Sequence, residues 1–176
     1  MKTISFNSLE VLPSLSDKTK TQTTRPAWKG WRKVMPLNLK MVKLTKEEAD
    51  EIMKETSEQL IPEPPGFKVG DKVKIYWKQK LIGIVKITDV FEVEMEIRQG
   101  SDEKLGSAIL YYYPIRLLKI GGKEYECSQD QWDNELEKFA KRNGFKSAEN
   151  MFEWFDKEYN LSEPKPFWVY RWKWVR

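Results

Sequence analysis

A short motif near the start of the chain, Lys20-Thr21-Gln22-Thr23-Thr24-Arg25, places three kinds of polar side chain close together. Lys20 offers an ammonium, Thr23 a hydroxyl and Arg25 a guanidinium. A guanidinium suits two-point contact with a phosphate or a base edge, whereas an ammonium acts as a point charge. Together the three groups would suit an anionic or carbonyl-rich ligand. A structural alternative is that Arg25 ends a strand and pairs with a helix carboxylate.

The geometry of the motif sets a condition on this interpretation. On an ideal strand Thr23 and Arg25 share one face, while Lys20 points to the other. A common site for all three side chains therefore requires Lys20 to lie in a turn before the strand.

The motif lies inside a strongly basic segment, residues 18–43, which contains no Asp or Glu. Its eight basic residues are Lys18, Lys20, Arg25, Lys29, Arg32, Lys33, Lys40 and Lys43. The chain has 31 Lys and Arg against 27 Asp and Glu, so the remainder outside this segment is net acidic. Concentrated positive charge beside flat rings, here Trp28 and Trp31, suits nucleic acid or a nucleotide. From charge alone, a solvated lysine-rich loop fits equally well.

The segment supplies the candidate binding residues. They are Lys18, Lys20, Thr23, Arg25, Trp28, Lys29, Trp31 and Arg32. As stacking platforms, Trp28 and Trp31 would each contribute about 1–3 kcal/mol per base, and as core residues they would anchor the segment. If the protein is an enzyme, Lys20 and Thr23 are the candidate catalytic residues.

Composition removes several kinds of chemistry. The chain contains no histidine, which excludes Ser-His-Asp and Cys-His catalysis, histidine zinc sites and histidine general bases. Cys127 is the single cysteine, so there is no disulfide framework and no cysteine metal site. No compact Asp/Glu cluster has obvious ligand spacing for Mg²⁺. We therefore expect no metal and no cofactor.

Length and hydropathy indicate one domain of 176 residues without a membrane partner. No apolar run approaches the roughly 20 residues that a membrane span needs, and the first residues lack the apolar core of a signal peptide. We expect a cytoplasmic protein.

Periodicity predicts the elements that would position the motif. Strands are expected at 3–6, 19–25, 72–78, 81–88, 91–97, 108–120 and 167–176. Helices are expected at 8–16, 45–60, 129–142 and 148–159, the last three starting at Thr45, Ser128 and Ser147 as N-caps. This pattern predicts an α+β fold, a small barrel with helices at one end. Residues 33–66 read as a partly helical insertion or lid.

The motif resembles the signature of the ASCH domain, a PUA-like β-barrel family. Lys20, Thr23 and Arg25 match that signature, and Lys18 stands where the family has Gly. Three further segments agree in order: 67–73, 83–90, and 137–145 followed by Trp154-Phe155. The resemblance covers most of the chain outside 33–66.

The resemblance implies a cleft that holds nucleic acid or a modified nucleoside, because ASCH domains are similar to RNA-binding PUA domains. One branch of the family hydrolyses N4-acetylcytidine, and another member type is reported as a ribonuclease. In the amidohydrolase branch the Lys and Thr of the motif act with a Glu on a helix. Asn143 stands at that position here and cannot shuttle a proton at neutral pH. Glu137 or Glu149 would replace it only if the helix were offset.

Three functions remain open from the sequence. We favour a module that binds RNA, single-stranded nucleic acid or a modified nucleoside through Lys20–Arg25. The alternative is a hydrolase that uses Lys20 and Thr23, either an amidohydrolase on an acylated pyrimidine nucleoside or a ribonuclease. The third is a protein-interaction adaptor that uses the 33–66 insertion.

Overall fold

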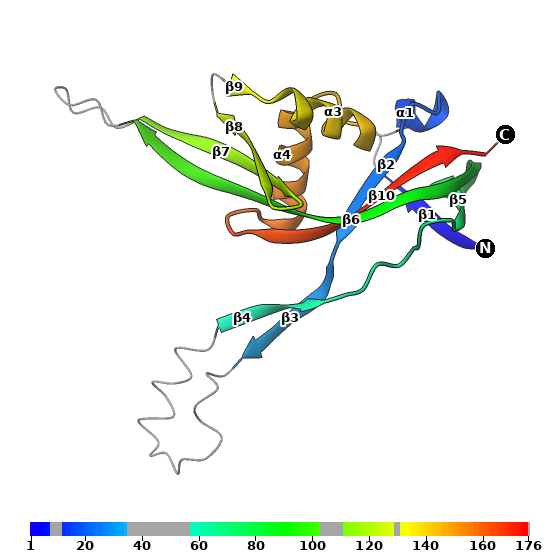
Figure 1. Ribbon diagram of the computed structural model, residues 1–176, viewed down its shortest axis with the longest axis horizontal. Coiled ribbons are helices and arrows are strands. Elements are labelled where there is room, and N and C mark those ends of the chain that lie inside the picture. Colours follow the sequence, from blue (N-terminus) through cyan, green and yellow to red (C-terminus); the bar gives the residue numbers. More distant parts are fainter. Residues whose placement is uncertain (8–11, 35–56, 103–110, 129–130, 176) are drawn as a thin grey trace, which may run out of the picture. The chain divides into compact units, whose positions relative to one another are not determined.

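The computed structural model describes residues 1–7, 12–34, 57–102, 111–128 and 131–175 (Figure 1). Across these residues the fold is α+β, with a mixed sheet and three helices, and no closed barrel is detected. The chain divides into two compact units, Met1–Pro26 with Pro65–Arg176, and Ala27–Pro64. The predicted insertion at 33–66 lies largely in the second unit, and its role as a lid stays a prediction.

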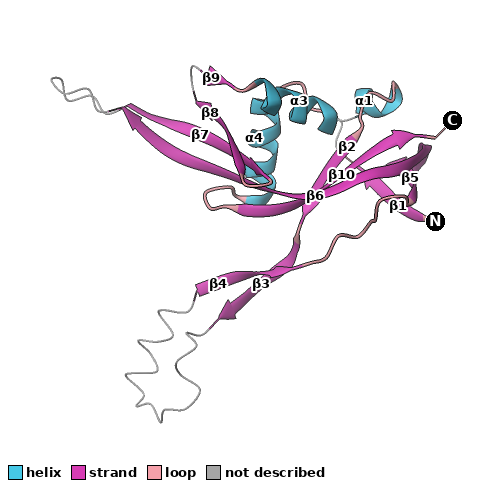
Figure 2. Ribbon diagram, in the orientation of Figure 1, coloured by secondary structure: helices cyan, strands magenta, loops and turns pink. Residues whose placement is uncertain are grey.

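The first unit holds most of the strands and all the described helices (Figure 2). Its strands are β1 (Lys2–Phe6), β2 (Gln22–Pro26), β5 (Lys72–Trp77), β6 (Lys80–Asp102), β7 (Tyr111–Ile120), β8 (Lys123–Ser128), β9 (Gln131–Trp132) and β10 (Lys165–Trp174). Its helices are α1 (Leu12–Ser16), α3 (Asn134–Asn143) and α4 (Ala148–Tyr159).

The sheet is organised around β6, a strand of 23 residues. One edge of β6 pairs first with β5 and then with β7, and the opposite edge pairs with β10. Beyond these neighbours, β1 adds to β5 in parallel, and β2 adds to β10 antiparallel. The path through the half that contains the motif is therefore β1-β5-β6-β10-β2.

This half of the sheet curls until its two outer strands approach each other. Four strand spacings would separate β1 from β2 by roughly 19 Å in a flat sheet. Instead, an Arg25 guanidinium N–H on β2 donates to the Ser5 carbonyl on β1 at 2.9 Å. A single side chain therefore joins two strands that do not pair with each other.

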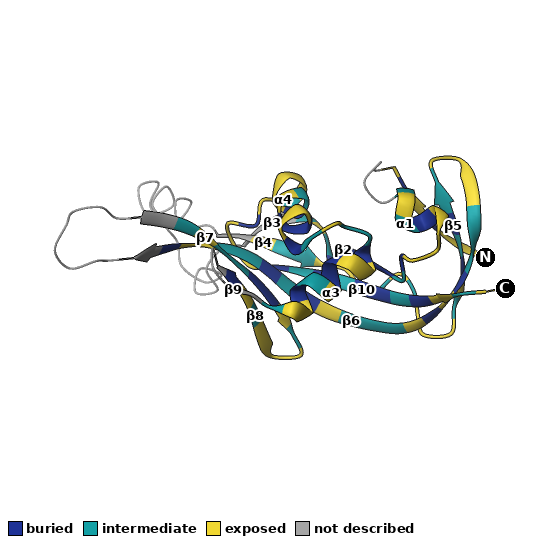
Figure 3. Ribbon diagram, turned by 90° about the horizontal axis from the view of Figure 1, so that it is seen from above, coloured by how far each residue is buried: buried dark blue, intermediate teal, exposed yellow. Residues whose placement is uncertain are grey.

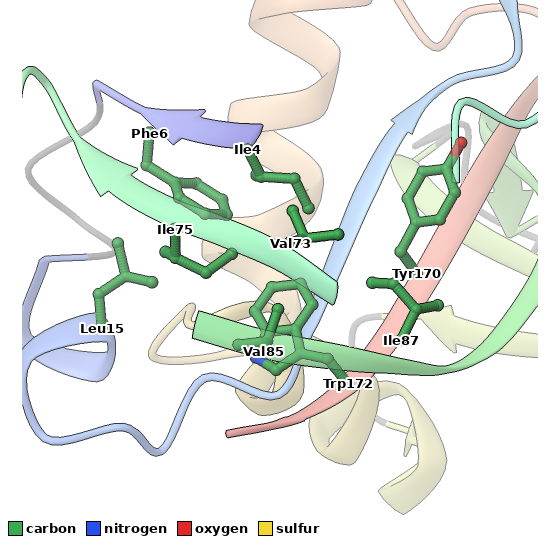
Figure 4. Packing of buried hydrophobic residues seen from close by; sticks show 9 residues of the cluster. All are labelled: Ile4, Phe6, Leu15, Val73, Ile75, Val85, Ile87, Tyr170 and Trp172. Carbon is green, nitrogen blue, oxygen red and sulfur yellow. The ribbon is translucent and has the colours of Figure 1, made fainter. Parts of the chain in front are cut away.

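The concave side of the curl encloses a hydrophobic core. Alternation along each strand sends every second side chain inward, as with Val73 and Ile75 on β5. Figure 4 shows these side chains pointing toward one another from four strands and α1. The cluster consists of Ile4, Phe6, Leu15, Val73, Ile75, Val85, Ile87, Tyr170 and Trp172.

Strand β10 is buried on both faces, since Tyr170 and Trp172 enter this core while Phe167 and Val169 on the opposite face are also buried (Figure 3). The opposite face meets α4, where the Phe155 ring stacks edge-on against Phe167 at 5.1 Å. The face of β10 that carries Tyr170 and Trp172 belongs to this core. The other face is equally buried because the helices cover it.

The helices begin and end at recognisable caps. Asp133 accepts from the Glu135 backbone N–H at 2.8 Å and starts α3, and Gly144 ends it in the left-handed region with φ 90°. Ser147 accepts from the Asn150 N–H and starts α4. The prediction for 148–159 is confirmed at both ends.

Some expected elements of the first unit have the wrong boundaries. The helix expected at 129–142 begins only at Asn134, because Ser128 ends β8 and Asp133 is the actual cap. The strands expected at 81–88 and 91–97 form one continuous strand, β6, since the chain between them keeps pairing with β10.

The described part of the second unit is an antiparallel pair of strands, β3 (Trp28–Val34) and β4 (Ser57–Pro62). The helix expected at 45–60 is contradicted over 57–60, where cross-strand pairing such as Leu60 opposite Trp31 overrides local helix propensity. The Thr45 cap lies outside the described residues.

None of the described helices is long and apolar enough to cross a membrane.

Gly144 offers a test of how tightly α3 packs on α1. An added Cβ at Gly144 would overlap the Ser14 hydroxyl oxygen, whereas one at Gly122, with φ 82°, meets nothing within 4 Å. Both glycine-to-alanine changes cost about 1–2 kcal/mol for the left-handed backbone. We expect Gly144→Ala to lose a further ~1–3 kcal/mol from overpacking, measured by urea unfolding.

In a Ser14→Ala background the clashing hydroxyl is gone. There, Gly144→Ala should cost only the backbone strain, and the extra loss of stability should disappear. Equal losses at Gly122 and Gly144 would contradict the close packing of α1 on α3.

Candidate ligand pocket

A pocket of about 200 Å³ opens between the outer strands β1 and β2, under the C-terminal end of α3 and beside α4. It lies entirely within the first unit. Its lining consists of Ser5, Phe6, Asn7, Lys20, Thr23, Thr24, Arg25, Asn143, Phe145, Trp154, Phe155 and Tyr159. All three matched motif residues thus meet at one cavity.

Lys20 lies in the turn before β2, which starts at Gln22, and this meets the condition set by the strand geometry. Its side chain is 2 % exposed, and its ammonium nitrogen donates to the backbone carbonyl of Asn143. The same nitrogen lies 5.1 Å from the centre of the Phe6 ring. The amine is therefore held between the end of α3 and an aromatic face.

The backbone of Lys20 is equally constrained. Its N–H donates to the Ser14 carbonyl at 2.8 Å, and its carbonyl accepts from the indole N–H groups of Trp172 and Trp174 at 3.1 Å each. Lys20 thus connects α1, α3 and β10. We call this set of contacts the Lys20 junction.

Burial, and then the positive charge of Arg25, hold the pKa of the Lys20 ammonium well below its usual value. Among the described lining residues there is no carboxylate to offset these effects. The site therefore favours the neutral amine more than water does. A role for Lys20 as a point charge, suggested by the sequence, stays a prediction.

Arg25 carries the pocket's cationic charge. Burial lowers its pKa, with the neighbouring Tyr159 and Tyr170 acting in the opposite direction, and a guanidinium keeps its charge under such a shift. Its guanidinium carbon lies 5.2 Å from the centre of the Phe6 ring, and one guanidinium N–H donates to the Ser5 carbonyl. The structural alternative, a pairing of Arg25 with a helix carboxylate, is absent from the described ion pairs.

The hydroxyl groups come from two consecutive strand residues. Thr23 and Thr24 are both buried, and both line the pocket. The Thr24 hydroxyl donates to the Asn143 side-chain oxygen at 3.0 Å, while the Asn143 amide N–H donates to the Phe139 carbonyl at 3.1 Å. The Asn143 side chain therefore joins β2 to α3 through these two hydrogen bonds.

An aromatic wall closes the side of the pocket formed by α4 and the loop before it. Trp154 and Tyr159 have ring centres 6.1 Å apart, and Phe145 lies 5.9 Å from Trp154. Phe155 and Tyr159 in turn pack on Phe167 of β10, which fixes the wall from behind. Flat rings of this kind offer faces for stacking.

The described lining contains no Asp or Glu. Glu137 accepts from the Ala148 backbone N–H at 3.0 Å, and Glu149 pairs with Arg116 at 3.4 Å. Neither carboxylate lines the pocket, so neither takes the place that Asn143 occupies. The polar surface of the pocket is correspondingly rich in donors.

The other candidate residues lie elsewhere. Lys18 is exposed, with its nitrogen 5.9 Å from the Trp174 ring, and it does not line the pocket. Trp28, Lys29, Trp31 and Arg32 belong to β3 in the second unit. Trp28 is half-buried and Lys29 exposed, and a role for these four in binding stays a prediction.

Several pocket residues were not among the candidates from the motif. Phe6, Thr24 and Tyr159 are the main ones. Tyr159 lies four residues after Phe155 on α4, so helical spacing could have placed both on one face. No sequence signal could have brought Phe6 to the motif, because that contact depends on the curl of the sheet.

Within the described part of the chain, no group of three or more His, Cys, Asp or Glu could hold a metal ion. No protein-family model, curated protein or solved structure matches the chain. The ASCH assignment therefore stays a prediction from the motif.

The environment of Lys20 predicts a pH-dependent stability. Because folding lowers its pKa, the unfolded chain binds more protons at this site below pH 10.5, so raising the pH favours the folded state. We expect the free energy of unfolding of wild type, relative to Lys20→Met, to increase from about pH 7 to about pH 10. Urea unfolding at several pH values measures the difference.

Lys157→Met, a change at an exposed lysine, serves as the control and should show no comparable trend. A pH-independent difference between wild type and Lys20→Met would mean that Lys20 keeps its ordinary pKa in the folded protein.

Proposed function

We propose that this chain binds RNA or another single-stranded nucleic acid, or a modified nucleoside, by taking one base into the pocket. The observation that carries the proposal is a donor-rich cavity with an aromatic wall, built around the basic motif, whose described lining contains no carboxylate.

The volume of the pocket limits the size of the ligand. Sites for drug-sized molecules measure roughly 300–1,000 Å³. At about 200 Å³ this pocket suits one ring system and its substituents. A strand of nucleic acid would leave its backbone and neighbouring bases outside the pocket.

The chemistry of the lining limits the kind of base. The Arg25 guanidinium and the Thr23 hydroxyl present N–H and O–H donors, and no carboxylate among the described lining residues competes for them. Such a surface pairs best with carbonyl and ring-nitrogen acceptors on a base edge. Tyr159 and Trp154 provide faces on which the ring could stack, worth about 1–3 kcal/mol.

The fold proposal rests on the same region. We propose a PUA-like ASCH fold, supported by the strand path β1-β5-β6-β10-β2 and the Arg25–Ser5 hydrogen bond between its ends. Lys20, Thr23 and Arg25 line the pocket between the outer strands, and this supports the proposal further. The cytoplasmic location expected from the sequence stays a prediction.

Binding can be measured through intrinsic tryptophan fluorescence, because Trp154, one of eight tryptophans in the chain, lines the pocket. The protein is titrated with single-stranded RNA, single-stranded DNA, cytidine and N4-acetylcytidine at two salt concentrations. We expect salt-sensitive binding of RNA, because displaced counterions drive it. Arg25→Ala should weaken binding about tenfold or more, since it removes charge-assisted hydrogen bonds.

Arg98→Ala is the matched control, because Arg98 pairs with Glu96 and does not line the pocket. Circular dichroism verifies that both variants are folded. Binding of none of these ligands by wild type, or equal losses in the two variants, would overturn the proposal.

A hydrolase is the second candidate, favoured by the environment of Lys20. A neutral amine in the same pocket as Thr23 could accept the proton of the Thr23 hydroxyl and activate it as a nucleophile. Since the described lining contains no carboxylate, the amine of Lys20, with its lowered pKa, is the group that would return the proton. This second candidate therefore depends on Lys20 for both proton transfers.

Release of cytidine from N4-acetylcytidine, followed by chromatography, tests this candidate. If the pocket is catalytic, Thr23→Ala abolishes turnover, Thr23→Ser retains part of it, and the rate rises with pH as Lys20 loses its proton. Turnover that survives in Thr23→Ala, or no turnover by wild type, would rule it out.

A further inference from the structure

A second concavity lies on the other side of the segment that ends α3. This groove of about 330 Å³ is more open than the pocket. It is lined by Ser14, Thr19, Lys141, Arg142, Gly144 and Phe145. None of these residues belongs to the basic motif, and no role described so far uses the groove.

The groove and the pocket share a thin wall. Phe145 lines both cavities, Asn143 lines the pocket, and Arg142 and Gly144 line the groove. A Cβ placed on Gly144 would lie 3.3 Å from Lys20 Cδ, which shows how little separates the two spaces. A ligand with two linked parts could therefore occupy both cavities.

The groove is cationic. Lys141 and Arg142 are exposed, and neither forms an ion pair within the described part of the chain. The pKa of Arg171 is lowered first by burial and then by the positive charge of Arg142. Arg171 is therefore a third cation, close enough to Arg142 to interact with it electrostatically. Asp17, whose carboxylate accepts from the Thr19 hydroxyl at 2.7 Å, does not itself line the groove.

Basic residues in a last helical turn often serve only to offset the helix dipole. Here the last carbonyls of α3 already have donors. The Phe145 and Gly144 N–H groups reach Ala140 and Lys141, while the Thr21 N–H and the Lys20 amine reach Arg142 and Asn143. The side chains of Lys141 and Arg142 are not needed as hydrogen-bonding caps and remain available to an anion.

We propose that this groove binds the phosphate group of the nucleotide whose base enters the pocket. The inference rests on the proposed function, and it assigns the anion to Lys141 and Arg142. Lys141 provides a point charge and Arg142 a planar fork that matches phosphate oxygens. The two cavities would then divide one nucleotide, with the ring in the pocket and the phosphate in the groove.

The test compares cytidine with its 5′- and 3′-monophosphates, and the readout is intrinsic tryptophan fluorescence. We expect wild type to bind one monophosphate about tenfold or more tightly than the nucleoside. Lys141→Ala/Arg142→Ala should abolish this difference and leave nucleoside affinity unchanged. The preferred phosphate position shows which side of the sugar faces the groove.

Lys86→Ala/Lys157→Ala is the control, because it removes the same charge from exposed positions outside both cavities and should keep the preference. Equal affinity of wild type for nucleoside and both monophosphates would overturn the inference while the proposed function stands. A preference that survives in Lys141→Ala/Arg142→Ala would also overturn it.

If wild type binds neither nucleic acid nor a nucleoside, the proposed function fails, and inorganic phosphate then tests the groove alone. A rise in Tm with phosphate that Lys141→Ala/Arg142→Ala loses and the control keeps would support a phosphate site. An equal or absent rise in all three proteins would overturn it.

Discussion

The Lys20 junction is the constraint on which the rest of the first unit depends. One residue donates through its amine to the end of α3, donates through its backbone to α1, and accepts from two tryptophans of β10. Burying an amine is costly unless it is hydrogen-bonded, so the Asn143 carbonyl fixes where α3 must end. The position of that end sets the roof of the pocket and the wall that separates it from the groove.

The pocket exists because the curl of the sheet stops short of closure. If β1 and β2 paired along their length, their backbone groups would fill the space where the cavity lies. Instead, Arg25 spans the opening with one hydrogen bond to Ser5 and remains beside the cavity with its other N–H groups. The same side chain thus holds the two outer strands together and offers donors to a ligand.

Local signals in the sequence located the motif, the strand alternation of β5 and the full extent of α4, because each depends on spacing or caps within a few residues. The start of α3 was misplaced, since Ser128 is as good a cap locally as Asp133 and only pairing of β8 decides between them. The aromatic wall and Phe6 join the site through long-range packing. The sequence did not predict the groove, because Ser14 and Thr19 are distant in sequence from Lys141 and Arg142.

Burial changes the role that the motif's lysine can play. In the sequence, Lys20 looks like a phosphate ligand, yet a desolvated amine next to Arg25 favours its neutral form. A neutral amine attracts an anion weakly, so attraction of a phosphate falls to cations that keep water around them. Lys141 and Arg142 meet that condition on the groove side of the wall. The separation of a buried lysine from exposed cations is what would let one site read a base and hold its phosphate.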